Sequence, residues 1–200
     1  MQVRELDVRD AYEFIPPRFS DDRGLFVAPL QEPALQEAIG HPLHVAQTNH
    51  SISVRGAIRG VHFADTPPGQ AKYIYCARGS LLDVVVDVRV GSPTFGRWDA
   101  VRLDDTEFRA MYLAEGLGHA FIALEDNTAM CYLCSVGYNP RAEHGINPLD
   151  PALNLPWPAE LTPVLSEKDA AAPTLAEAEA SGLLPWYADC VAHYEKLRAG

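Results

Sequence analysis

One short stretch of the chain, residues 57–76, places a histidine between two cationic side chains: AIRGVHFADTPPGQAKYIYC. Arg59 precedes His62 by three residues, Lys72 follows it by ten, and apolar residues surround all three. An imidazole titrates near neutral pH, so His62 could be a base, a metal ligand or an ordinary core residue. The stretch alone leaves these three roles open.

The metal role has no local support in the sequence. Metal-binding jelly rolls usually place two inward-facing histidines one residue apart on a strand, and the chain has no H-x-H motif. Cys131 and Cys134 form a CxxC motif, but TAMCYLCSV has the character of a strand, and residues three apart on a strand point to opposite faces. This spacing is therefore poor for chelation or for a disulfide.

The base role requires three further groups. A carboxylate can fix the tautomer of the histidine, an ammonium can stabilise an oxyanion, and a tyrosine can donate a proton. Such a set suits removal of a proton next to a carbonyl and its return to the opposite face, which is epimerisation or isomerisation. The candidates are His62, Lys72, Tyr132 and Asp150, although spacing alone does not distinguish them from core or surface residues.

Short strands must hold these side chains in place. From about residue 24 to residue 136, strand patterns alternate with turn signals. In LLDVVVDVRV, residues 81–90, apolar residues share one face, while Asp83, Asp87 and Arg89 share the other. This organisation predicts a mainly β protein with an antiparallel sandwich or barrel.

A polar strand face could mark the inside of such a barrel. In AQTNHSISV, residues 46–54, one face carries Gln47, Asn49, Ser51 and Ser53. These side chains would be solvated on an open sheet, but in a barrel they would line a wet interior that binds a ligand. The periodicity does not choose between the two arrangements.

The chain changes character from about residue 139. A loop rich in proline and asparagine follows, and then TLAEAEASG and WYADCVAHYEKLRA predict two short helices on the outside of the barrel. We therefore expect a single domain over residues 1–200, with a β core at about 24–136 and the late loop and helices at 137–200.

Composition limits the possible partners. The chain has 200 residues and a net charge of −11, which disfavours nonspecific binding to nucleic acid. No run of residues is long and apolar enough for a membrane span or a signal peptide, so the expected location is cytoplasmic.

Five segments, in order, resemble the deoxysugar nucleotide epimerases typified by dTDP-4-dehydrorhamnose 3,5-epimerase. The resemblance runs from about residue 14 to residue 158, and its late loop is most similar to the branch that makes sugars for antibiotics. The segments are DDRGLF, QTNHSISVRGAIRGVHF, GQAKYIYCARGSLLDVVVDVRVGSPTFGRW, YLAEGLGHAF and CYLCSVGYNPRAEHGINPLDPALNLPWP.

The resemblance implies a cupin-type jelly roll that forms a homodimer and uses no cofactor or metal. It implies a dTDP-4-keto-6-deoxyhexose as substrate, epimerised at carbon 3, carbon 5 or both. His62 would be the base, Asp150 its orienting carboxylate, Lys72 the enolate stabiliser and Tyr132 the acid. The implied contacts to nucleotide or sugar are Arg23, Gln47, Asn49, Arg59, His119 and Tyr138.

Two positions depart from the family pattern. Ala28 stands where a glutamate near the thymine is common, and Ala64 stands where a glutamine often follows the HF pair. The main alternative within the class is an epimerase for one carbon only. Alternatives from other classes are a metal-dependent jelly-roll enzyme and a sugar-binding domain without catalysis.

Overall fold

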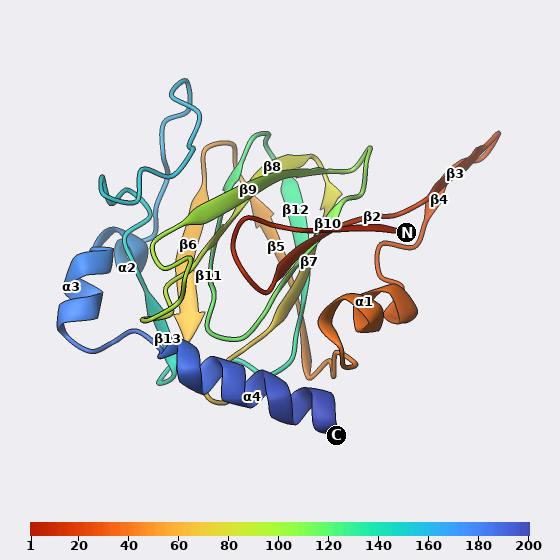
Figure 1. Cartoon of the computed structure of the whole chain (residues 1–200). Helices are drawn as coiled ribbons and strands as arrows, with labels where there is room; N and C mark the ends of the chain where they lie inside the picture. The colour runs from red at the N-terminus through yellow and green to blue at the C-terminus, as the bar shows by residue number, and fades with distance from the viewer.

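Two antiparallel sheets face each other in the computed structural model, which describes residues 1–200 (Figure 1). The first has the strand order β1-β2-β10-β7-β12-β5, and the second has the order β13-β6-β11-β8-β9. Their strands are β1 (Gln2–Glu5), β2 (Ala11–Ile15), β5 (Gln47–Ser53), β6 (Ile58–Ala64), β7 (Lys72–Arg78), β8 (Ser80–Val86), β9 (Trp98–Asp104), β10 (Ala110–Leu113), β11 (Gly118–Ala123), β12 (Thr128–Cys134) and β13 (Glu143–Gly145). The predicted mainly β, antiparallel architecture is confirmed, although the strands extend beyond residues 24–136 at both ends.

Strand β5 has its polar face inside the barrel. Gln47, Asn49 and Ser51 are half-buried and Ser53 is buried, whereas His50 and the other residues between them are exposed. The sequence left open whether these polar side chains face solvent on an open sheet or line a barrel interior. In the structure they line the barrel interior, where a ligand can reach them.

Apolar side chains pack on both sides of the five-stranded sheet. One cluster of 24 buried residues fills the space between the sheets and extends to the helices behind the six-stranded sheet. A second cluster includes Val84, Val86 and Val88, the apolar face predicted for residues 81–90, together with Ala178 and Leu184 from the C-terminal segment. Burying one such side chain stabilises the fold by roughly 1.5–3 kcal/mol, so these clusters keep the two walls of the interior in place.

A bulge in β6 allows two important side chains to share one face. His119 pairs with His62 while Phe121 pairs with Arg59, so three steps on β6 match two steps on β11. Gly60 and Val61 thus lie opposite Ala120, and an added Cβ on Gly60 would lie 2.3 Å from the carbonyl oxygen of His119. Without the bulge Arg59 and His62 would point to opposite faces, as Cys131 and Cys134 do on β12.

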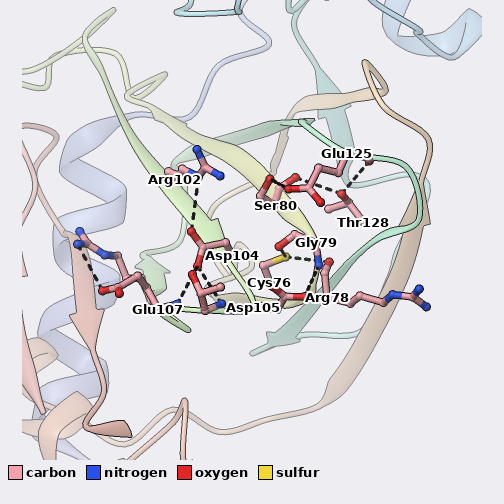
Figure 2. Close-up of polar contacts among 12 residues, drawn as sticks. Cys76, Arg78, Gly79, Ser80, Arg102, Asp104, Asp105, Glu107, Glu125 and Thr128 are labelled. Carbon is pink, nitrogen blue, oxygen red and sulfur yellow. Dashed lines mark hydrogen bonds and ion pairs between the residues drawn. The ribbon is translucent and has the colours of Figure 1, made fainter. Parts of the chain in front are cut away.

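Turns at one end of the barrel are closed by local polar contacts (Figure 2). The Gly79 amide, in the turn from β7 to β8, donates to Asp105 just after β9 over 2.8 Å. The Ser80 hydroxyl donates to Glu125 over 2.6 Å, and Thr128 donates to the carbonyl oxygen of Ser80. These contacts tie β7, β8, β9 and β12 together at one end.

Four helices surround the sheets: α1 (Glu32–Ile39), α2 (Glu167–Ala170), α3 (Leu175–Ala180) and α4 (Tyr187–Ala199) (Figure 1). The two helices predicted near the C-terminus correspond to α3 and α4, whereas α1 and α2 were not predicted. Arg89 anchors α4, because its buried guanidinium donates to Asp87, to Asp10 and to the Tyr194 hydroxyl of α4. None of the four helices has the length and apolar character needed to cross a membrane.

A separate hairpin, β3 (Arg18–Asp21) with β4 (Gly24–Val27), projects away from the barrel (Figure 1). Its two strands pair only with each other, and Phe19 and Phe26 are 60 % and 68 % exposed. A two-stranded ribbon is only marginally stable by itself, and exposed aromatic residues are typical of an interaction surface.

Candidate active site

A cavity of about 550 Å³ opens between the two sheets. Its lining includes Arg59, His62 and His119 from the five-stranded sheet and Lys72 and Tyr132 from the six-stranded sheet. The volume lies within the ordinary range for small-molecule sites. The two sheets therefore present chemically different groups to one ligand-sized space.

His62 is held by a carboxylate from α2. Its Nε2 lies 2.6 Å from Oδ1 of Asp169, and since an ionised carboxylate can only accept, the ring donates the Nε2 proton. Nδ1 then carries the lone pair that can take a proton. Burial would raise the pKa of Asp169, but the His62 contact and the hydrogen bonds from Ser166 and the Gly60 backbone together lower it. The carboxylate is therefore ionised at neutral pH.

The orienting role expected for Asp150 is wrong. Asp150 is buried, and its two carboxylate oxygens accept the backbone amides of Ala152 and Leu175 over 2.9 and 2.8 Å. It therefore fastens the late loop to the start of α3, and it does not line the cavity. The carboxylate that contacts His62 is Asp169, nineteen residues further along the chain.

Lys72 and Tyr132 lie on the wall opposite His62. Burial lowers the pKa of Lys72, while Cys134, Glu143 and Asp83 oppose that shift. Burial also raises the pKa of the Tyr132 phenol, with Cys134 and Glu143 adding to the effect and Arg59 opposing it. Tyr132 therefore keeps its proton at neutral pH and can donate it.

Of the other residues predicted to contact the nucleotide or sugar, some line the cavity and some do not. Asn49, Arg59, His119 and Tyr138 line the cavity. Gln47 lies behind that lining, where its side chain donates to Asn49 over 2.7 Å and accepts the backbone amide of Tyr138 over 2.9 Å. It therefore supports two lining residues.

Three positions discussed from sequence lie outside the cavity. Arg23 is in the turn of the β3–β4 hairpin, almost fully exposed, and pairs with Asp21. Ala28 and Ala64, the two departures from the family pattern, are absent from the lining as well. Arg23 is thus separated from the other predicted site residues within this chain.

Three charged lining residues were missed from sequence: Glu143, Lys168 and Asp169. A local signal existed for two of them, since Ser166 accepts the amide of Asp169, and a serine followed three residues later by an acid often begins a helix. That signal predicts α2 but does not say that the helix reaches the barrel interior.

The cavity carries more cationic than anionic side chains, although the whole chain is acidic. Arg59, Lys72 and Lys168 line it, against Glu143 and Asp169. The excess of positive charge suits an anionic ligand, and arginine in particular matches phosphate oxygens. The β barrel thus holds a histidine–carboxylate pair, a lysine and a tyrosine around a cationic pocket. These features define a class of jelly-roll enzymes that perform acid–base chemistry on an anionic substrate.

Comparison with known proteins identifies the family. The family described as dTDP-4-dehydrorhamnose 3,5-epimerase matches residues 5–177. A dTDP-4-dehydrorhamnose 3,5-epimerase of Mycolicibacterium smegmatis is 51 % identical over 99 % of this chain and 98 % of its own. A dTDP-4-dehydrorhamnose 3-epimerase of Streptomyces niveus is 52 % identical over 96 % of this chain and 92 % of its own.

A solved structure agrees with these sequence relatives. The rmlC epimerase of Mycobacterium tuberculosis superposes with a TM-score of 0.96 at 49 % identity, covering 99 % of this chain and 100 % of the other. The chain belongs to the dTDP-4-dehydrorhamnose 3,5-epimerase family. The predictions of an epimerase and of a cupin-type jelly roll are thereby confirmed.

Two isosteric substitutions distinguish the role of Asp169 from that of Asp150. We expect Asp169→Asn to lower kcat for epimerisation by about 10²–10³-fold, because the amide no longer fixes and stabilises the basic tautomer of His62. We expect Asp150→Asn to keep kcat within about threefold while lowering the free energy of unfolding by about 1 kcal/mol, because the asparagine NH2 cannot accept one of the two backbone amides that the carboxylate accepts. Steady-state kinetics and urea denaturation measure the two effects. A larger loss of kcat in Asp150→Asn would contradict the assignment.

Proposed function

We propose that this enzyme inverts carbon 3 of a dTDP-4-keto-6-deoxyhexose by removing a proton and returning one to the opposite face. The observation that carries this proposal is the placement of a histidine–carboxylate pair and a tyrosine on opposite walls of one cavity. Relatives named as 3,5-epimerases and as 3-epimerases are equally similar to the chain, and carbon 3 is common to both activities. Inversion of carbon 5 as well is the further possibility within the same chemistry.

The first step takes the proton from the carbon next to the 4-keto group. Nδ1 of His62 forms the new N–H bond, and the electrons of the broken C–H bond move onto the ketone oxygen to give an enolate. Asp169, which holds Nε2–H at 2.6 Å, stabilises the imidazolium that results. The ammonium of Lys72, on the opposite wall, stabilises the enolate oxygen.

The second step returns a proton to the other face of the sugar. Tyr132 holds its phenolic proton because burial raises its pKa, and it is on the sheet that faces His62. The enolate collapses to the ketone as the carbon takes this proton, which leaves the configuration inverted. Arg59 and Lys168 supply charge for the diphosphate, while Asn49, His119 and Tyr138 contact the rest of the nucleotide sugar.

We also infer that the enzyme acts as a homodimer in which the β3–β4 hairpin packs on the partner barrel. The hairpin pairs with no other strand of its own chain and exposes Phe19, Leu25 and Phe26. Arg23 at its turn lies away from the cavity of its own chain. In the partner's cavity it would add a guanidinium for the diphosphate.

The regiochemistry is tested by NMR of the product formed in deuterated water. Incubation with dTDP-4-keto-6-deoxyglucose should place deuterium at carbon 3, because the base and the acid exchange their protons with solvent. Deuterium at carbon 5 as well, with proton coupling constants of the opposite configuration at both carbons, would show that both are inverted. A product without deuterium at carbon 3 would contradict the proposed function.

Mixed dimers test the contribution of Arg23. A site needs His62 from one subunit and Arg23 from the other, so His62→Ala and Arg23→Ala homodimers should both be impaired. In a mixed dimer one site regains both residues, so co-expression of the two variants should restore about half the parental activity per mixed dimer. Light scattering gives the oligomeric state, and a monomer, or mixed dimers without recovery, would contradict the arrangement.

A further inference from the structure

The cavity wall holds a second histidine–carboxylate pair, and the carboxylate of this pair has no role in the reaction described above. Nε2 of His119 lies 2.9 and 3.1 Å from the two carboxylate oxygens of Asp83. His119 is on β11 and lines the cavity, whereas Asp83 is on the neighbouring strand β8 and is fully buried. The pair thus reaches from the cavity lining into the core behind it.

Asp83 depends on His119 for its hydrogen bonds. No other group of the protein donates to its carboxylate, and its inward-facing neighbours on β8, Leu81 and Val85, are buried apolar residues. Removing a carboxylate from water is costly unless it is paired, and an apolar residue at such a position is often equally or more stable. Packing therefore gives no reason for an acid at this place in the strand.

The contact determines which ring nitrogen of His119 is available. A carboxylate accepts hydrogen bonds, so Nε2 carries a proton that it donates to Asp83. Nδ1 makes no hydrogen bond within the protein and is the ring nitrogen left for a ligand in the cavity. A rotated ring would leave both the buried carboxylate and the ligand without this partner.

We propose that Asp83 is a positioning residue that fixes His119 with Nε2 toward the core, so that Nδ1 meets the bound nucleotide sugar. The proposal rests on the proposed function of the cavity, and it assigns to Asp83 no contact with substrate. Asp83 acts on His119 as Asp169 acts on His62. The difference is that Asp83 is fully buried and lies on β8, the strand next to the one that carries His119.

A double-mutant cycle tests whether Asp83 acts through His119. We expect Asp83→Asn to lower kcat/KM by about 10–100-fold, the range for loss of a buried charged hydrogen bond. In a His119→Ala background, the same substitution should change kcat/KM by less than about threefold, because the group it positions is gone and only the weaker effect of its charge on the pKa of Lys72 remains. Losses that multiply in the double variant, or an Asp83→Asn enzyme with parental kcat/KM, would overturn the proposal.

The matched control is Asp65→Asn. Asp65 accepts a hydrogen bond from His144 over 2.7 Å, but neither residue lines the cavity. This variant should keep kcat/KM within about twofold of the parent, since the exposed pair contributes little. A loss as large as that of Asp83→Asn would also count against the proposal.

A measurement on the unmodified protein covers the case in which Asp83→Asn does not fold. Nitrogen-15 NMR of labelled histidine should show His119 protonated at Nε2, with an Nδ1 signal that shifts when dTDP is added. A His119 ring protonated only at Nδ1 would overturn the proposal. Failure of the parent to exchange deuterium into the 4-keto sugar would instead refute the proposed function, and the NMR result would still test the pairing.

Discussion

The hydrogen bond between His62 and Asp169 joins the barrel wall to a helical turn 107 residues later. For Asp169 to reach the cavity, the long segment after β12 must return across the edge of the five-stranded sheet. Strand β13 pairs with β6 there, and Asp150 fastens the same segment to α3. These contacts order the late loop, which contains little regular structure, and so place the Asp169 carboxylate beside His62.

A second constraint acts on β6 itself. A regular strand cannot point Arg59 and His62 into the same cavity, and the bulge at Gly60 and Val61 resolves this conflict. Only glycine fits, because an added Cβ would collide with the backbone of β11. The bulge therefore places the cation for the substrate and the base for the reaction on one wall, while Lys72 and Tyr132 occupy the other.

Sequence patterns predicted the architecture well because strand alternation reports directly on burial. The polar face of β5 and the valine face of β8 both appear in the structure as expected from their period of two. The site was predicted less completely. His62, Lys72, Tyr132 and Arg59 reach one cavity, but the carboxylate was assigned to Asp150.

That error has a physical cause. Asp150 lies in an irregular loop and Asp169 in the single turn of α2, and both are too short of regular structure for periodicity to show which way a side chain points. Both are buried, and they meet different partners: backbone amides for Asp150 and an imidazole for Asp169. Local sequence patterns cannot predict a contact between side chains that are far apart in the sequence. They also cannot predict the bulge that brings Arg59 and His62 to one face.

The central claim is that His62 is the base, and deuterium exchange in a His62→Ala variant tests it most directly. With dTDP-4-keto-6-deoxyglucose in deuterated water, the variant should incorporate no deuterium into the sugar, while calorimetry should show that dTDP still binds. Exchange at the parental rate in a variant that binds dTDP normally would show that another group removes the proton.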